Sequence, residues 1–371
     1  MRTGKEILVT RSSMPPIEEY IDMIKQLWDS HWITNMGTLH NQLEKELETF
    51  LGENYVQLTV NGHMALELAI QSMNFAAGSE VITTPFTFVS TTYAIIRNRL
   101  EPVFCDIKED LTIDESKIED LITEKTVAIV PVHVYGNPCN VEGIEEIAKR
   151  HNLKVIYDAA HAFGECHHGK GISAYGDLSI FSFHATKVYN TIEGGAVCCR
   201  NEEQYKKIYN LKNFGIQSEE LVTDIGSNAK MNEFSAAMGL CNIKHFENER
   251  VKRKQVVEKY KRLLCDLEQI AFGINEDIEK SNYAYFPVIF ETEELRNKVY
   301  ENLAKGNIRA RKYFYPLTSD VAYFGDKYSK MDLKRARYYS DRILVLPLYA
   351  DLPNVDVERI VLIVKETLQK Y

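Results

Sequence analysis

The sequence predicts an α/β protein with a mainly parallel sheet, helices on both faces of that sheet, and a second, smaller α+β domain. Three observations predict this class. Short runs rich in Val, Ile, Phe and Tyr recur between about residues 55 and 200, and helical patterns separate several of them. After about residue 230 the pattern changes to long amphipathic helices followed by a mixture of strand-like and helical segments. Runs that are apolar throughout indicate strands buried on both faces, and helices between them are typical of parallel connections.

Seven segments are expected to be strands of the large sheet, because each is short and rich in β-branched or aromatic residues. In chain order they are 55–60, 80–86, 101–107, 127–134, 153–160, 178–183 and 195–200. Between them, helices are expected at 63–73 and 141–151.

The remaining elements are expected in the carboxyl-terminal part. Residues 232–267 are expected to form one or two long amphipathic helices, and residues 355–370 the final helix. The segments 283–290 and 307–315 lie between these helices and indicate a smaller mixed α+β domain.

Length, charge and cysteine content narrow the class of protein. The 371 residues exceed the size at which single cores stop growing, so we expect a large domain at 1–245 and a small domain at 246–371. The net charge of −9 disfavours nucleic-acid binding. The seven scattered cysteines lack CxxC spacing, no apolar signal segment is present, and no apolar run approaches the ~20 residues that span a bilayer. We expect a cytoplasmic protein with reduced thiols and neither a membrane nor a nucleic-acid partner.

Lys187 lies between a predicted strand end and a glycine-bearing turn, in the stretch FSFHATKVYNTIEGGA. Taken alone, a solvated surface lysine is the usual interpretation. A lysine with a neutral amine is also a nucleophile, and its covalent chemistry is Schiff-base formation with a carbonyl or with pyridoxal phosphate. That cofactor needs an acid at its pyridine nitrogen, donors for its phosphate and a flat surface against its ring.

Other predicted strand ends offer these groups, and strand ends are where open α/β sheets bind ligands. Asp158 is the candidate for the acid, while an aspartate that caps the following helix is an equally open interpretation. Helix starts present unpaired N–H groups to anions, and a serine adds a hydroxyl donor. The candidates for the phosphate are Gly62, His63, Met64 and Ser182, and the candidate for the ring surface is Phe88.

Four segments carry a resemblance to a known family. They are PVHVYGNPCNVEGIEEIA at 131–148, VIYDAAHAFG at 155–164, GDLSIFSFHATKVYNTIEGGAV at 176–197 and KMNEFSAAMGL at 230–240. In their order and spacing, the chain resembles the DegT family of sugar aminotransferases from about residue 14 to about residue 350. The resemblance implies an aspartate-aminotransferase-like fold, fold type I, for the large domain.

The resemblance also implies residue roles. Lys187 corresponds to the lysine that binds pyridoxal 5'-phosphate covalently and acts as general base, and Asp158 to the aspartate at the pyridine nitrogen. His161 corresponds to a residue that binds the 3-hydroxyl of the cofactor. Ser182 and Asn228 correspond to phosphate ligands, and the asparagine usually comes from the neighbouring subunit. A homodimer with shared active sites is therefore implied.

The substrates are implied in the same way. The chain is most similar to family members that move the amino group of glutamate to a dTDP-4-keto-6-deoxyhexose, giving dTDP-4-amino-4,6-dideoxyglucose for a surface glycan such as O-antigen. The residues expected near the nucleotide sugar are Thr34, Asn35, Gly37, Lys312 and Tyr313. For Lys312 and Tyr313, an aromatic-rich core strand is an equally open interpretation.

One position departs from the family pattern. Where the family commonly shows Ser-Gly-Thr at the first phosphate turn, this chain has Asn61, Gly62 and His63. A side-chain hydroxyl is therefore missing at His63, and two interpretations stay open. Either the imidazole donates in its place, or His63 is a plain residue of the helix start.

Other functions remain as alternatives. A 3-keto-6-deoxyhexose aminotransferase and a non-enzymatic regulator that binds pyridoxal phosphate both fit the resemblance. A dehydratase relative would carry histidine at the catalytic position, whereas this chain has Lys187. Zinc hydrolysis by His161, His167 and His168 is disfavoured, because the last two resemble a hairpin tip and lack ligand spacing. We therefore expect no metal.

Overall fold

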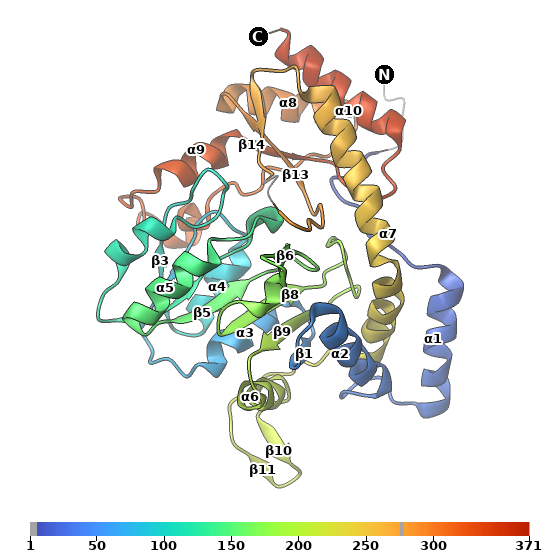
Figure 1. Cartoon of the computed structure of the whole chain (residues 1–371), viewed down its shortest axis with the longest axis vertical. Helices are drawn as coiled ribbons and strands as arrows, with labels where there is room; N and C mark the ends of the chain where they lie inside the picture. Colours follow the sequence, from blue (N-terminus) through green and yellow to red (C-terminus); the bar gives the residue numbers. More distant parts are fainter. Residues whose placement is uncertain (1–5, 275–277, 371) are drawn as a thin grey trace.

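A computed structural model of the chain describes residues 6–274 and 278–370. A seven-stranded sheet forms the centre of its larger part (Figure 1). In spatial order its strands are β1 (Val56–Thr59), β9 (Gly195–Cys199), β8 (Leu178–Ser182), β5 (Lys154–Asp158), β4 (Thr126–Val130), β2 (Glu80–Thr83) and β3 (Glu101–Phe104). Only β9 runs antiparallel to its neighbours, β1 and β8, and the other pairs are parallel. The predicted α/β class and mainly parallel sheet are confirmed.

Helices cover both faces of this sheet. On one face lie α3 (Gly62–Ser72), α4 (Val89–Arg97) and α6 (Glu202–Lys212), whose apolar residues share a core with Leu178 and Ile180 of β8. The opposite face is covered by α2 (Thr38–Leu51), α5 (Val141–His151) and the first half of α7 (Glu233–Leu264). Phe181 of β8 packs on that side. Successive residues of a strand thus direct their side chains to opposite faces of the sheet, and both faces are buried, as continuous apolar runs predict.

Asparagines begin four of these helices, and in α6 the side chain of Asn201 accepts the N–H of Gln204. The side chain of Asn61 accepts the N–H of Met64 in α3, Asn140 accepts that of Gly143 in α5, and Asn232 accepts that of Ser235 in α7. Such caps satisfy backbone donors that the first helical turn leaves unpaired. The remaining amino-terminal helix, α1 (Ile17–Ser30), packs against α7.

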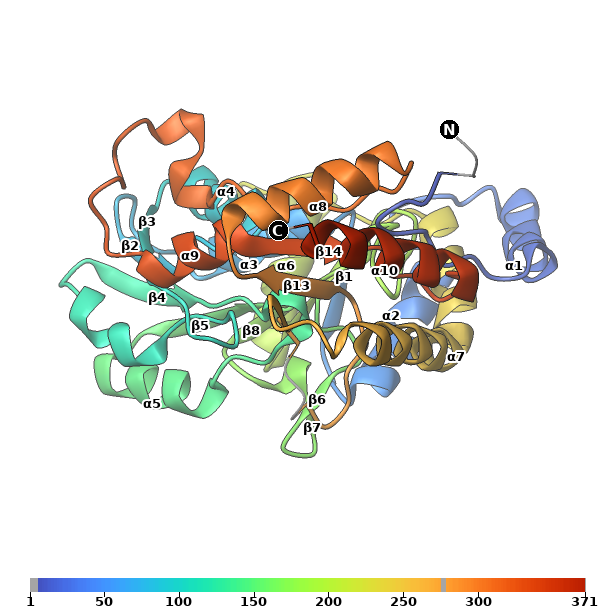
Figure 2. The same ribbon diagram turned by 90° about the horizontal axis from the view of Figure 1, so that it is seen from above.

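The smaller part is built on an antiparallel sheet. Its strands are β12 (Ile270–Phe272), β13 (Phe286–Phe290) and β14 (Ile343–Leu346). Helices α8 (Glu293–Lys305) and α10 (Asn354–Leu368) run beside it, as Figure 2 shows, and α9 (Lys334–Arg342) precedes β14. The second half of α7 supplies residues to the same core. The expected domain boundary between 245 and 246 falls inside α7 and stays a proposal.

The segment 307–315 forms no named strand. It is tied to the rest by isolated bridges, Ile308 to Ile7 and Arg311 to Val345. Two small hairpins complete the strands: β6 (Cys166–His167) with β7 (Lys170–Gly171), and β10 (Ile216–Ser218) with β11 (Leu221–Val222). The second hairpin projects from the body of the molecule in Figure 1.

Six 3₁₀ turns connect the elements of the described residues: η1 (Glu115–Lys117), η2 (Glu119–Leu121), η3 (Val134–Gly136), η4 (Ile172–Ala174), η5 (Thr318–Asp320) and η6 (Ala322–Phe324).

Among residues 6–274 and 278–370, none of the helices combines the length and apolar character that crossing a lipid bilayer requires.

Candidate active site

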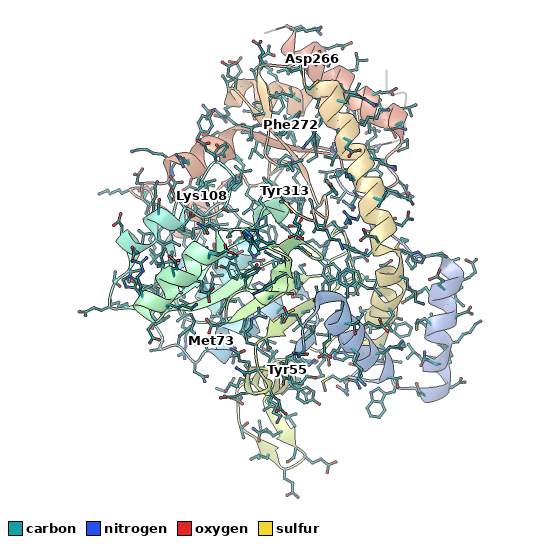
Figure 3. All side chains as sticks on the ribbon, viewed as in Figure 1. Tyr55, Met73, Lys108, Asp266, Phe272 and Tyr313 are labelled. Carbon is teal, nitrogen blue, oxygen red and sulfur yellow. The ribbon has the colours of Figure 1, made fainter. Side chains whose placement is uncertain are left out.

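A cavity of about 420 Å³ lies at the carboxyl ends of β5 and β8, beside the start of α3. Lys187 and Asp158 both line it. The smaller part of the molecule contributes four further lining residues, Tyr285, Arg311, Tyr313 and Phe314. Tyr313, labelled in Figure 3, belongs to the segment between α8 and α9. The cavity thus forms between the predicted strand ends and a late segment of the chain.

Lys187 lies in the loop between β8 and β9. Among the described residues, its amine makes neither a hydrogen bond nor an ion pair, and Asp158 is the charged group that acts on it. Burial lowers the pKa of Lys187 to about 8, and the Asp158 carboxylate partly opposes this shift. A substantial fraction of the amine is therefore neutral near physiological pH, which is the state a nucleophile or base requires.

Asp158 ends β5 and is buried. Thr91 Oγ1 donates to its Oδ2 at 2.8 Å, and the backbone N–H of Ala160 donates to its Oδ1 at 3.1 Å. Burial nevertheless raises the pKa of Asp158, while these two donors and Lys187 lower it. A buried carboxylate of this kind is stabilised by a further cation, so the site favours a positively charged ligand group.

His161 is held in one orientation. The backbone N–H of Tyr135 donates to its Nδ1 at 3.1 Å, so the proton of the neutral ring resides on Nε2. Burial lowers the pKa of His161 well below its usual range, and the charge of Lys187 adds to this effect. Its ring lies parallel to Phe314, with centroids 6.0 Å apart. His161 is thus a neutral donor in the cavity wall.

The start of α3 offers backbone donors to the cavity. Among the described residues, the N–H groups of Gly62 and His63 have no hydrogen-bond partner, as expected for a first turn. A Cβ on Gly62 would lie 2.5 Å from Cβ of Ser182, so only glycine allows β8 and α3 to meet this closely. Two backbone donors and a serine hydroxyl therefore adjoin one another.

Met64 does not extend this donor set. Its N–H donates to Asn61 Oδ1 at 2.8 Å, and the residue does not line the cavity. A phosphate role for Met64 stays a prediction, and in this structure the helix cap already uses its donor. Phe88, in contrast, lines the cavity and is about half exposed, so its ring offers an accessible apolar surface there.

The residues expected near the sugar are divided. Tyr313 lines the cavity, but Lys312 points to α8, where its amine donates to Asn297 Oδ1 at 2.6 Å. The structure does not bring Lys312 to the cavity, because this contact and the ring of Tyr300, 5.0 Å away, hold the amine elsewhere.

The loop before α2 also lies outside the cavity of the single chain. Thr34 and Asn35 are exposed, and Gly37 packs against Glu233. Asn228 is exposed and lines no part of the cavity either. For Asn228 this agrees with the expectation that it serves a neighbouring subunit, which stays a prediction, as does the substrate role of Thr34, Asn35 and Gly37.

The zinc alternative finds no support in the geometry of the described residues. His161 lies in the cavity wall, whereas His167 and His168 form the expected hairpin tip beside Glu142. The three histidines that a hydrolytic zinc would need are not gathered.

Sequence reasoning missed several residues of the site. Thr91 and Ser90 open α4 beside the predicted Phe88, and Tyr285, Arg311 and Phe314 come from the smaller part. The stretch TTPFTFVST offered a signal for the first pair, since hydroxyl residues follow a predicted strand end. No local signal marked the other three, because their approach depends on how the two parts pack.

Comparison with known proteins places this chain in a family. The sequence pattern of the DegT/DnrJ/EryC1/StrS aminotransferase family matches residues 16–365. The chain belongs to this family. A dTDP-4-amino-4,6-dideoxy-D-glucose transaminase of Shigella dysenteriae is 42% identical over 365 residues, covering 98% of this chain and 99% of the relative. A transaminase of the same name from Escherichia coli is 41% identical over 364 residues, covering 96% and 97%.

Solved structures agree. Helicobacter pylori PseC, an aminotransferase involved in the biosynthesis of pseudoaminic acid, matches with a TM-score of 0.93 and 28% identity over 99% of this chain and 100% of that one. DesI, solved in the presence of its TDP-sugar product, matches with a TM-score of 0.92 and 28% identity, covering 100% and 94%. The predictions of fold type I and of a sugar aminotransferase are confirmed. Aminotransferases of this family depend on pyridoxal phosphate.

Proposed function

We propose that this aminotransferase uses pyridoxal 5'-phosphate to move the amino group of L-glutamate to a dTDP-4-keto-6-deoxyhexose, giving dTDP-4-amino-4,6-dideoxyglucose for a surface glycan such as O-antigen. The observation that carries the proposal is that Lys187 and Asp158 line one cavity. The names and high identity of the Shigella dysenteriae and Escherichia coli relatives support the choice of sugar.

The residues present fit the cofactor. The carboxylate of Asp158, which burial disfavours when it is alone, matches a protonated ring nitrogen. Nε2–H of His161 offers a donor for the ring hydroxyl, and Phe88 an apolar surface. The backbone donors of Gly62 and His63 suit a phosphate, since a helix start attracts anions.

Lys187 moves the proton of the reaction. When bound, the cofactor supplies an electron sink that stabilises negative charge at the α-carbon of the donor. With the cofactor bound, the Lys187 amine, which is neutral above about pH 8, would accept the proton from that carbon and would be the group that returns it. Asp158 would keep the ring nitrogen protonated, and Thr91 and Ala160 fix the carboxylate in position.

Arg311 is the residue we assign to the carboxylate of the amino-acid donor. Its backbone pairs with Val345 of β14 in both directions, at 3.0 and 2.8 Å, and its guanidinium stacks 4.6 Å from the ring centroid of Tyr313. Among the described residues no carboxylate lies within ion-pair distance of Arg311, although it lines the cavity. A guanidinium that is held in place without a carboxylate partner suits bidentate binding of a carboxylate.

We also propose a homodimer with shared active sites. Ile225 is 90% exposed, Trp28 64% and Trp32 58%, and large exposed apolar side chains mark association surfaces. Asn228 lies on the same loop as Ile225, and its exposure supports the proposal that it serves a neighbouring cavity. All seven cysteines are free, which fits a reducing compartment such as the cytoplasm.

Product analysis tests the proposal. The purified protein is incubated with glutamate and, separately, with dTDP-, UDP- and GDP-linked 4-keto-6-deoxy sugars, and NMR locates the new nitrogen. Amination of the dTDP sugar at carbon 4 is expected. Amination at carbon 3 only would favour the 3-keto alternative, and binding of the cofactor without any transfer from glutamate would favour the regulator.

A further inference from the structure

His63 and Ser90 form a hydrogen-bonded pair in the wall of the cavity. His63 stands at the start of α3 and Ser90 in the first turn of α4, and both line the cavity. His63 Nδ1 lies 2.8 Å from Ser90 Oγ. The imidazole therefore does not point freely into the cavity but acts on the hydroxyl of a neighbouring helix.

The other ring nitrogen faces an acidic group. His63 Nε2 lies 3.5 Å from Glu67 Oε2, one turn along α3, and the same oxygen accepts from Arg97 Nε at 2.8 Å. A carboxylate requires a proton on Nε2, because two acceptors would otherwise face each other. Glu67 thereby fixes Nε2 as a donor. The direction of the hydrogen bond to Ser90 then depends on whether Nδ1 also carries a proton.

A bound phosphate determines that direction. If neutral His63 accepts the proton of Ser90, the hydroxyl has none left to donate to an anion. If the ring is protonated, Nδ1 donates to Ser90 Oγ and the hydroxyl proton is free to point to the phosphate. A phosphate near the α3 start accepts hydrogen bonds, so binding it selects the second arrangement.

We infer that His63 and Ser90 together bind the phosphate of the cofactor, with His63 as the positioning residue and Ser90 as the hydroxyl donor. This inference rests on the proposed function. It resolves the departure at His63: the missing side-chain hydroxyl is supplied from α4, and His63 orients it through the 2.8 Å contact with Ser90. The pair then does the work of a hydroxyl residue at position 63.

The test measures binding of pyridoxamine phosphate to cofactor-free protein, because this form does not bond covalently to Lys187. His63→Ala and Ser90→Ala are each expected to weaken binding about tenfold, as loss of a charge-assisted hydrogen bond does. The double variant is expected to be no weaker than the worse single one, since the two residues act as a unit. His63→Thr is expected to recover most of the affinity, and Ser90→Ala in that background to cost at most about twofold.

Two controls separate this role from a structural one. Pyridoxamine, which lacks the phosphate, should bind all variants alike, and the ³¹P resonance of bound pyridoxamine phosphate should shift in His63→Ala. His151→Ala is the matched control. His151 also contacts a glutamate, Glu119, but it lies on α5 and does not line the cavity, so this variant should bind pyridoxamine phosphate as the parent protein does. Independent, additive losses, equal losses with pyridoxamine, or affinities within about twofold of the parent protein would overturn the inference. Failure of the parent protein to bind pyridoxamine phosphate would instead contradict the proposed function.

Discussion

The hydroxyl of Thr91, on α4, donates a 2.8 Å hydrogen bond to the carboxylate of Asp158, at the end of β5. Both side chains are buried, and Thr91 is in turn 3.0 Å from the hydroxyl of Thr87. The contact lowers the pKa of Asp158 against the opposite effect of burial. Thr91 therefore favours the charged form of the carboxylate and fixes its orientation. Pairing with a protonated ring nitrogen requires both.

Replacement of this hydroxyl should reduce turnover. We expect Thr91→Val to lower kcat about tenfold, because the carboxylate loses a donor and part of its charged population. Thr92→Val is the matched control: Thr92 is the next residue of α4, equally buried, and bonds to Thr318 at 2.9 Å instead. If both variants lose the same activity, the loss reflects packing of α4 and not the support of Asp158.

The pKa of Lys187 predicts a pH dependence for the cofactor-free protein. Only the neutral amine attacks an aldehyde, so the rate of pyridoxal phosphate capture should rise up to about pH 8 and then level off. Stopped-flow absorbance measures this profile. A rate that still climbs steeply towards pH 10 would mean that the amine is not shielded from water as the cavity requires.

The same shift predicts a change in stability. The folded state binds fewer protons than the unfolded chain between the lowered pKa of about 8 and the ordinary value of 10.5, so the free energy of unfolding rises with pH across this window. Between these two pH values, the free energy of unfolding of the cofactor-free parent protein should increase by roughly 2 kcal/mol relative to that of Lys187→Met. Denaturant unfolding measures this difference. A difference that stays constant from pH 8 to 10.5 would contradict the shift.

Arg311 should determine affinity for the amino-acid donor. We expect Arg311→Gln to raise the KM for glutamate tenfold or more, because the carboxylate of glutamate would lose the guanidinium that binds it. Binding of pyridoxamine phosphate should be nearly unchanged. Arg309→Gln is the control, since Arg309 lies on the same segment but pairs with Glu6 at 2.7 Å. Steady-state kinetics with varied glutamate would refute the assignment if both variants behaved alike.

Shared active sites predict recovery of activity on mixing two inactive variants. Lys187→Ala and Asn228→Asp should each be inactive or weak alone. A mixed dimer contains one site with both native residues, so random exchange should restore up to about a quarter of the parent activity. Activity assays after co-refolding, with the single variants as controls, measure this. If Asn228 served the cavity of its own chain, no mixture would exceed its components.

The sequence predicts the parts of the site that local pattern determines. Lys187, Asp158 and Ser182 follow apolar runs that are strands, and a parallel sheet brings such ends to one edge. Arg311 and Phe314 could not be found in this way, because they reach the cavity from an irregular segment whose position depends on packing against β14.

The details at the phosphate end show a second reason. Met64 looked equivalent to Gly62 and His63 in sequence, yet the cap by Asn61 takes its N–H, and this depends on one side-chain rotamer. The pairing of His63 with Ser90 depends on how α3 and α4 are turned towards each other. Such relations are properties of the packed structure and leave no periodicity in the chain.

Covalent trapping tests the central claim most directly. The protein is loaded with pyridoxal phosphate, reduced with borohydride, digested and mapped by mass spectrometry. The account predicts a single reduced pyridoxyl group on Lys187, and none in a Lys187→Ala variant treated in the same way. Modification of a different lysine, or equal labelling of the variant, would contradict it.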